Sequence, residues 1–587
     1  MADGSHWRAF ATLLQPRSRD VWVTCVALLV AGALPLVGPI LLAEFIDVMT
    51  EGGATSTLAT LALAYVAIGV ARQALAVVIA WLATDLAWKV TNELRSDLTR
   101  HVLSLDLGFH RRTSPGELVS RVDGDVTALS DFIARFAVKA AAAAVTLVGV
   151  VAILLVRDWR VGIGLSVYLA IAVVTVFALR NFAIDEAASE QAATGRLLGE
   201  VEERLVGADD LRSNGGGSHA VATFQHASRR VLRATLARER QAVGFWIIAN
   251  GVFVIGGILA LAVNVALLRR GSISLGTAYL IFQYTQLMRY PLSQLADETE
   301  RVQRAGGGMV RTLQLFAETT AITDEGSETL AEGPLTISLD ELTFQYDDED
   351  DPRPVLDGLT LDLAAGRTMG VLGRTGSGKT TLARLLLRLV EPTSGRIMLN
   401  GTDLDQVPLR ELRARIGVVS QDVHLFGASI RDNLTLFDAG VSDDALRAAL
   451  AELGLLTWVE AMPKGLDTLL GPEGSGLSAG EGQLIALTRL FLRSPDLVVL
   501  DEASSRVDPD TEERLTAAFE RLLAGRTAVV IAHRLSTVER LDEVLVLDAG
   551  RIVEHGETAA LASDAGSRYA RLRAVGVDTL DEIASQS

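Results

Sequence analysis

The stretch that decides the fold of the second half of the chain is Gly373-Arg374-Thr375-Gly376-Ser377-Gly378-Lys379-Thr380. It matches the phosphate-binding pattern G-x-x-x-x-G-K-[ST], in which glycines let backbone N–H groups turn towards phosphate oxygens. A strand pattern at Met369–Leu372 precedes it and a helical pattern at Thr381–Val390 follows it, which is the context that the motif requires. The motif predicts a nucleoside triphosphate site, and by itself it leaves a kinase or a GTPase open.

An acidic pair at the end of another apolar run predicts the chemistry of that site. The run Leu497–Leu500 leads into Asp501 and Glu502. A buried strand would thus deliver Asp501 to a Mg²⁺ ion and place Glu502 to polarise the water that attacks the γ-phosphate. Lys379 is expected to reach the β- and γ-phosphates, and Thr380 to ligate the metal. The pair could instead be an accidental strand end, but the phosphate loop upstream counts against that reading.

A third motif indicates the class of protein. Leu477-Ser478-Ala479-Gly480-Glu481-Gly482-Gln483 precedes a helical stretch and resembles the signature of the ATP-binding cassette (ABC) family, usually written L-S-G-G-Q. The family's other motifs occur around it in the family's order. They are an aromatic residue that stacks on adenine, a Q-loop, a D-loop and a switch histidine, at Tyr346, Gln421, Asp508 and His533.

The resemblance implies that two such domains hold two ATP molecules head to tail between them. Each site would combine the phosphate loop of one chain with the signature of the other, so a second cassette would come from another subunit. The residues implied in ATP binding are Tyr346, Gly373, Arg374, Thr375, Gly376, Ser377, Gly378, Lys379, Thr380, Thr381 and Gln421. Gln421 would also ligate Mg²⁺, and His533 would act in catalysis with Glu502. The residues implied in contacting the partner's ATP are Leu477, Ser478, Ala479, Gly480 and Glu481.

The chain departs from the family pattern at several positions. Ala479 and Glu481 replace the usual glycine and glutamine of the signature, and Ser505-Arg506-Val507 replaces a small apolar run before Asp508. None of these changes removes a group that touches phosphate or metal in the family scheme. They favour co-adaptation with a different partner, so a heterodimer is at least as well supported as a homodimer.

The first half is strongly apolar. The whole chain of 587 residues is 49% hydrophobic with a mean hydropathy of +0.31. Six apolar runs, at about 21–46, 56–84, 134–156, 160–180, 243–268 and 275–297, can each supply the roughly 20 residues that cross a bilayer. The long polar stretches after the second and fourth runs are predicted to continue these helices into the cytosol. Cys25 lies in the first run and is expected to be a small buried residue.

These patterns predict an all-α six-helix transmembrane domain at 21–320, followed by an α/β P-loop ATPase domain at 335–575 and a tail at 576–587. Residues 1–20 read as an interfacial helix or, alternatively, as a disordered leader. The net charge of −18 argues against nucleic-acid binding, which needs a basic surface.

The first half also resembles the exporter-type membrane domain of the ABC family. Gly116–Val126 resembles the first coupling helix of that domain, and Val206–Asn214 corresponds to the second. The charged residues predicted to transmit ATPase closure to the spans are Arg121, Asp123, Asp209 and Asp210. They could instead be solvated surface.

A polar stripe of Tyr279, Gln283, Gln286 and Tyr290 shares one helical face of the last span. Because lipid penalises polar groups, the stripe should line a substrate cavity or hydrogen-bond to another helix.

The sequence therefore predicts an ATP-hydrolysing transporter subunit of the cell membrane, with its ATPase domain in the cytoplasm. As a dimer it would export an amphiphilic small molecule, drug, lipid or peptide. One alternative is an importer with the exporter fold, for example of a metal chelate. The other is a membrane-anchored ATPase regulator without a pumped substrate.

Overall fold

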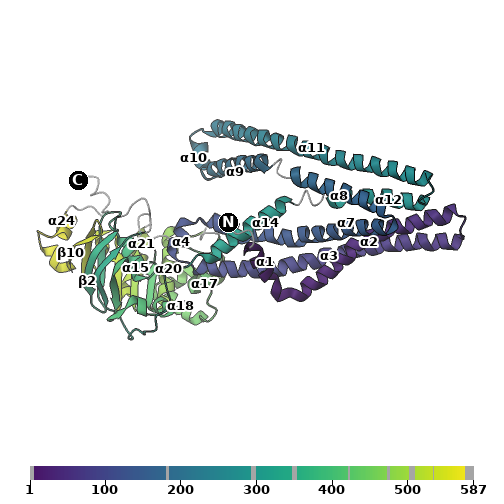
Figure 1. Cartoon of the computed structure of the whole chain (residues 1–587). Coiled ribbons are helices and arrows are strands. Elements are labelled where there is room, and N and C mark those ends of the chain that lie inside the picture. Colours follow the sequence, from purple (N-terminus) through teal and green to yellow (C-terminus); the bar gives the residue numbers. More distant parts are fainter. Residues whose placement is uncertain are drawn as a thin grey trace. The chain divides into compact units, whose positions relative to one another are not determined.

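The chain folds into two compact units. The computed structural model describes residues 5–179, 184–292, 299–346, 353–420, 423–471, 476–501, 509–532 and 534–574 (Figure 1). The helical unit comprises Met1–Ser104 and Thr113–Glu318, and the sheet unit comprises Leu105–Arg112 and Thr319–Ser587. The short segment Leu105–Arg112 therefore belongs to the sheet unit, although it interrupts the helical half of the sequence.

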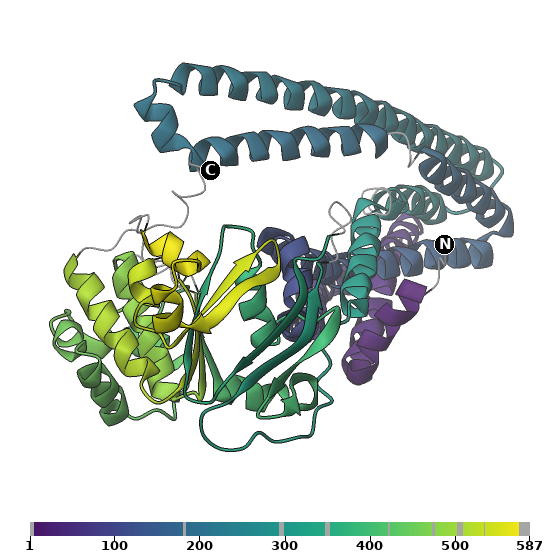
Figure 2. The ribbon, with the colours of Figure 1, turned by 90° about the vertical axis from the view of Figure 1, so that its left-hand side faces the viewer.

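The described part of the helical unit consists of helices. They are α1 (Ser5–Leu14), η1 (Gln15–Arg17), α2 (Ser18–Thr50), α3 (Thr55–Ser104), α5 (Pro115–Val119), η2 (Ser120–Asp125), α6 (Val126–Asp131), η3 (Phe132–Ala137), α7 (Val138–Arg157), α8 (Trp159–Leu179), α9 (Ile184–Val206), α10 (Ala208–Ser213), α11 (Gly217–Arg269), α12 (Leu275–Leu287) and α14 (Thr299–Ala317). The 50 residues of α3 and the 53 of α11 each form one continuous helix. This agrees with the prediction that the apolar helices continue through the polar stretches. In Figures 1 and 2, α9 lies alongside α11.

Four helical stretches among the described residues are long and apolar enough to cross a bilayer. They are Thr12–Thr50, Thr55–Ser104, Pro115–Arg157 and Gly217–Arg269, and Trp159–Thr175 is a shorter apolar helix. These five correspond to the first five predicted spans. The sixth predicted span, 275–297, begins as α12 and runs beyond the described range that ends at residue 292.

Apolar side chains from α2, α7, α8 and α12 form the core of the helical unit. Tyr284, which is fully buried, donates its hydroxyl to the carbonyl oxygen of Leu36 at 2.8 Å and so ties α12 to α2. Thr146 of α7 donates to the carbonyl oxygen of Gly32 at 2.9 Å. A Cβ on Gly32 would lie 2.6 Å from the Cβ of Val145, so glycine permits this close approach of α2 and α7. The expectation that Cys25 is buried was wrong, because its side chain is exposed on α2.

The sheet unit contains two sheets. The strands are β1 (Ile337–Phe344), β2 (Leu356–Leu363), β3 (Thr368–Leu372), β4 (Ser394–Leu399), β5 (Thr402–Asp403), β6 (Ile416–Val419), β7 (Leu497–Asp501), β8 (Thr527–Ile531), β9 (Glu543–Asp548) and β10 (Arg551–Glu557). The larger sheet has the order β10-β9-β3-β8-β7-β6 and is parallel except for the edge strand β10. The smaller sheet is antiparallel, in the order β2-β1-β4-β5.

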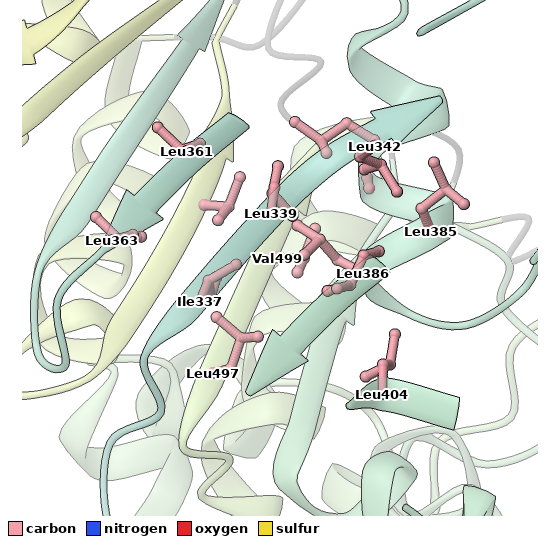
Figure 3. Packing of buried hydrophobic residues seen from close by; sticks show 14 of the residues in the cluster. Ile337, Leu339, Leu342, Leu361, Leu363, Leu385, Leu386, Leu404, Leu497 and Val499 are labelled. Atoms are coloured by element: carbon pink, nitrogen blue, oxygen red, sulfur yellow. The ribbon is translucent and has the colours of Figure 1, made fainter. Parts of the chain in front are cut away.

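Helices connect and cover these strands. They are α4 (Leu107–Arg112), α15 (Lys379–Leu386), η4 (Leu404–Gln406), α16 (Leu409–Arg415), α17 (Ile430–Thr435), α18 (Asp443–Glu452), α19 (Leu456–Glu460), η5 (Gly465–Asp467), α20 (Ala479–Arg493), α21 (Pro509–Leu523), α22 (Leu535–Val538), α23 (Thr558–Ser563) and α24 (Arg568–Ala574). Every residue of β7 and β8 is buried, as expected of parallel strands covered on both faces. Figure 3 shows Ile337 and Leu339 of β1 in one core with Leu497 and Val499 of β7. The fold class predicted from the sequence, a helical domain followed by an α/β domain, is confirmed.

Candidate functional site

The predicted phosphate loop connects β3 to α15. It carries positive φ angles at Gly376 (+82°) and Gly378 (+101°), which L side chains rarely adopt. A Cβ on Gly378 would also lie 2.5 Å from Cδ2 of Leu356 and 2.9 Å from the carbonyl oxygen of Val355. The glycines are therefore required by the loop's own conformation. The loop ends at the N-terminus of α15, where the helix dipole and the backbone N–H groups of the first turn favour an anion.

Lys379 and Thr380 start α15 beneath this loop. The buried Lys379 donates from Nζ to the carbonyl oxygens of Gly373 at 2.6 Å and Arg374 at 3.0 Å, so its stem is held against the loop. Thr380 Oγ1 donates to Oδ2 of Asp501 at 3.3 Å. The parallel strands β3, β8 and β7 end at the same edge of the sheet, which is why residues so far apart in sequence meet there. A hydroxyl and a carboxylate oxygen suit Mg²⁺, so these two side chains fit the predicted metal.

Tyr346 is held from several sides. Its hydroxyl contacts Oγ1 of Thr381 at 3.2 Å and accepts from Nη1 of Arg384 at 3.0 Å. The Phe344 ring packs edge-on, with ring centres 4.7 Å apart. The guanidinium carbon of Arg111, from α4, lies 4.4 Å from the centre of the Tyr346 ring. Thr381 was predicted to bind ATP. In the structure its hydroxyl contacts the hydroxyl of Tyr346.

The signature residues lie at the start of α20. Ser478 is the N-cap of the helix, and both Ser478 and Ala479 are exposed, whereas Gly480 is buried. Leu477 and Glu481 are half-buried. The exposed N-terminus of α20 is therefore accessible to a second molecule.

Four predicted residues lie outside the described ranges. They are Gln421, Glu502, Asp508 and His533. Their roles in binding and catalysis stay predictions from the sequence.

The residues predicted to transmit closure lie on short helices of the helical unit. Arg121 of η2 pairs with Glu117 at 2.5 Å, and Asp123 pairs with Arg95 of α3 at 3.0 Å. Asp209 and Asp210 are exposed in the first turn of α10. An apolar hollow of about 300 Å³ beside them is lined by Val201 and Leu205 of α9, Leu211 of α10, and Val221 and Phe224 of α11.

Sequence reasoning missed Asp106, which precedes α4 in the sheet unit. Its Oδ1 accepts the N–H of Phe109 at 2.9 Å, and its Oδ2 accepts the N–H of Ala321 at 2.8 Å. Asp106 therefore both caps α4 and joins it to the chain that enters the sheet unit. The sequence did contain a signal, because an aspartate just before a helix is a common cap.

The predicted polar stripe runs along α12 to Tyr290, just beyond the helix, and faces away from the core of the helical unit. Gln286 and Tyr290 are exposed, and Tyr279 and Gln283 are half-buried, while Leu280, Ile281, Tyr284 and Met288 on the other side are buried. Sequence reasoning did not assign a role to Arg289. This exposed residue donates from Nη2 to Oδ1 of Asn250, and its guanidinium carbon lies 5.9 Å from the Phe253 ring centre. Neither α11 partner neutralises the positive charge of Arg289.

Comparison with known proteins shows similarity along most of the chain. The profile of the ABC transporter transmembrane region matches residues 21–292, and that of the ABC transporter domain matches residues 356–505. An ATP-dependent lipid A-core flippase of Photobacterium profundum is 32% identical over 501 residues, covering 84% of each chain. A Bacillus subtilis protein, YgaD, is named provisionally for multidrug export. It is 26% identical over 572 residues, covering 96% of this chain and 98% of YgaD. The solved structure of a bacterial Atm1-family ABC exporter with ATP bound superposes with a TM-score of 0.82 at 25% identity. It covers 95% of this chain and 98% of that one.

Proposed function

Because the chain belongs to the ATP-binding cassette transporters, as an exporter subunit with its membrane domain and ATPase in one polypeptide, we propose that it exports an acidic amphiphile. The chain binds ATP and couples its hydrolysis to transport. The helical unit spans the membrane, the ATPase domain is cytoplasmic, and the transporter works as a dimer. The class of cargo, the make-up of the dimer and the roles of single residues are proposals.

The observation that supports an acidic cargo is the exposed polar face of α12 with Arg289 at its end. A charged side chain within membrane-spanning helices is costly unless it faces water, a partner or a ligand. The amide oxygen of Asn250 and the Phe253 ring hold the guanidinium in place and leave its charge available to an anion. Gln283 and Gln286 on the same face suit the polar groups of an amphiphile. The similarity to a flippase supports only the amphiphilic part of the proposal, because that relative is named for a lipid.

ATP would bind on the phosphate loop, with Tyr346 against the adenine and Lys379 directed at the phosphates. Thr380 and Asp501 would hold Mg²⁺, which neutralises phosphate charge when bound. Glu502 would orient and deprotonate the attacking water. The signature of the partner would complete the site, and closure of the two ATPase domains would drive the membrane helices.

A heterodimer is supported by two departures from the family pattern, Ala479 in the signature and Ser505-Arg506-Val507 before Asp508. Expressing the chain alone and measuring its ATPase activity tests this point. Full activity of a purified homodimer contradicts it, whereas activity that depends on a co-expressed second half-transporter supports it.

The cargo proposal is tested in proteoliposomes that contain the purified transporter. Three fluorescent lipids with the same tails and an anionic, a zwitterionic or a cationic head are compared for stimulation of the ATPase and for translocation. We expect the anionic lipid to be preferred, and Arg289→Gln to abolish that preference. Arg269→Gln, an exposed arginine at the end of α11, is the matched control and should retain it. Equal transport of all three lipids, or an unchanged preference in Arg289→Gln, contradicts an acidic cargo.

The same vesicles distinguish the two alternative functions. Accumulation of the lipid on the ATPase side indicates import, and ATPase activity that no lipid changes favours a regulator without cargo.

A further inference from the structure

Glu481 makes three hydrogen bonds that fix the start of α20. Its Oε2 accepts the backbone N–H of Ser478 at 2.7 Å, while its own N–H is donated to Oγ of Ser478 at 3.3 Å. These two bonds form a capping box at the helix N-terminus. Its Oε1 accepts the indole N–H of Trp458, from α19, at 3.0 Å. One carboxylate therefore joins the signature to a neighbouring helix of the same unit.

The two groups that bond to the Glu481 side chain are both donors only. A backbone N–H and an indole N–H each require an acceptor. A carboxylate offers two acceptor oxygens, one for each donor. A glutamine offers one oxygen and one NH₂ group, so one of the two donors would face another donor. Glutamine, the usual residue of the family signature, therefore cannot satisfy both donors in the geometry that Glu481 adopts.

Ser478 is the residue that this arrangement positions. Its hydroxyl accepts from the backbone of α20 and its N–H is held by Glu481, so both polar groups have defined directions. The negative charge of Glu481 also lies in the first turn of a 15-residue helix, where the helix dipole stabilises it.

We infer that Glu481 and Trp458 are a matched pair that positions Ser478 for the ATP bound to the partner subunit. Glu481 is a positioning residue in this reaction, and Trp458 is the reason that it is a glutamate. The inference rests on the proposed function, in which the signature acts across the dimer.

The test is a set of variants in the complete transporter dimer, assayed for ATP turnover as a function of ATP concentration. In Glu481→Gln, Ser478 or Trp458 loses its acceptor, and we expect kcat to fall at least fivefold. KM for ATP should change less than twofold, because the phosphate loop and Tyr346 are untouched. Trp458→Phe removes the donor and keeps an aromatic ring, so it should cost less than Glu481→Gln.

The decisive variant combines the two changes. In Trp458→Phe/Glu481→Gln, a single amide oxygen suffices for the one remaining donor, so kcat should return to within about twofold of Trp458→Phe. Glu460→Gln, an exposed carboxylate of α19 that pairs with Arg447, is the matched control and should behave as wild type. This rescue also separates positioning from folding, since a merely damaged protein is not repaired by a second substitution.

Each outcome decides the inference. Rescue by the double variant supports it. Wild-type turnover in Glu481→Gln, or a double variant no better than Glu481→Gln alone, overturns it. If Glu481→Gln does not fold, kcat of the double variant is compared with kcat of Trp458→Phe alone. Values within about twofold of each other support the inference, and a lower kcat in the double variant overturns it. Failure of the proposed function is a separate result, because the wild-type dimer would then hydrolyse ATP without transporting any lipid.

Discussion

The guanidinium of Arg111 lies over the ring of Tyr346, with its carbon 4.4 Å from the ring centre. Tyr346 is the residue predicted to stack on adenine. Arg111 belongs to α4, which lies more than two hundred residues before Tyr346 in the sequence although both are in the sheet unit. If adenine stacks on Tyr346 as predicted, the base and α4 would share one aromatic ring.

Replacing Tyr346 with alanine is expected to weaken ATP binding without lowering maximal turnover much. Stacking on a base contributes about 1–3 kcal/mol in nucleic-acid systems, and we apply that scale to adenine. The measurement is KM and kcat for ATP. Tyr346→Phe keeps the ring and loses only the hydroxyl contacts with Thr381 and Arg384, so it should bind ATP nearly as well as wild type. An unchanged KM in Tyr346→Ala would show that the ring is an ordinary surface aromatic.

Removing the guanidinium with Arg111→Gln is expected to lower KM for ATP about two- to fivefold. An exposed cation–π contact contributes about 0.5–1 kcal/mol, and the base has to replace it on the ring. The effect should vanish in a Tyr346→Ala background, because the shared ring is then absent. Arg112→Gln, the adjacent arginine of α4, is the control. A higher KM in Arg111→Gln, or an effect that persists without Tyr346, contradicts competition for the ring.

The hydrogen bonds of Asp106 to Phe109 and Ala321 should make the stability of the folded protein depend on pH. Burial by itself raises the pKa of this carboxyl, but the N–H groups of Ala321 and Phe109 and the charge of Arg112 lower it below its usual value overall. A carboxyl whose pKa is lower in the folded state stabilises the fold above its unfolded pKa, about 3.9, and loses that effect as pH falls through the folded pKa.

We therefore expect Asp106→Asn to lower the midpoint of thermal unfolding of the full-length protein at neutral pH. The amide retains one acceptor oxygen for two N–H donors. The difference from wild type should shrink only below about pH 4. A difference that disappears already between pH 5 and 7 would contradict a lowered pKa for Asp106.

Glu502→Gln is expected to retain ATP binding and to reduce turnover by about 10²–10⁴, the contribution of a general base. The prediction follows from the position of Glu502 directly after Asp501 at the end of β7. ATP binding and single-turnover hydrolysis are measured on the dimer with its partner identified, because an active partner site blunts the effect. Turnover within a few-fold of wild type would exclude Glu502 as the base.

The next prediction concerns the four charged residues that are predicted to transmit closure of the ATPase domains to the membrane helices. Replacing Asp209 and Asp210 with alanines, or Arg121 and Asp123 with alanines, is expected to leave basal hydrolysis intact while transport into vesicles fails. ATPase and transport are compared in the same vesicles. If these charged residues are only solvated surface, the substitutions would change stability by only about ±0.5 kcal/mol and leave both activities at wild-type levels. Wild-type activities would therefore argue against a coupling role for these four residues. The next segment to test would be α4, because it groups with the sheet unit.

Much of the fold was predictable because its signals are local. The phosphate loop lies between β3 and α15 as its motif requires, and the apolar runs became long helices. The contact of Thr380 with Asp501 followed from motif order alone. The grouping of Leu105–Arg112 with the sheet unit was not predicted, because Gly116–Val126 carries the more recognisable sequence. Nothing in the sequence shows that Arg111 lies over Tyr346 or that Trp458 bonds to Glu481, since both contacts join segments that only tertiary packing brings together.

The position of β3 in the sheet has a consequence for biosynthesis. This strand carries the phosphate loop, and it pairs on both sides with strands made much later, β8 at residues 527–531 and β9 at residues 543–548. Non-local pairs of this kind cannot form until the later segment has left the ribosome. The growing chain thus synthesises all its membrane helices before the strand that carries its phosphate loop can be paired. Translation order therefore delays completion of the larger sheet until the membrane helices have been synthesised.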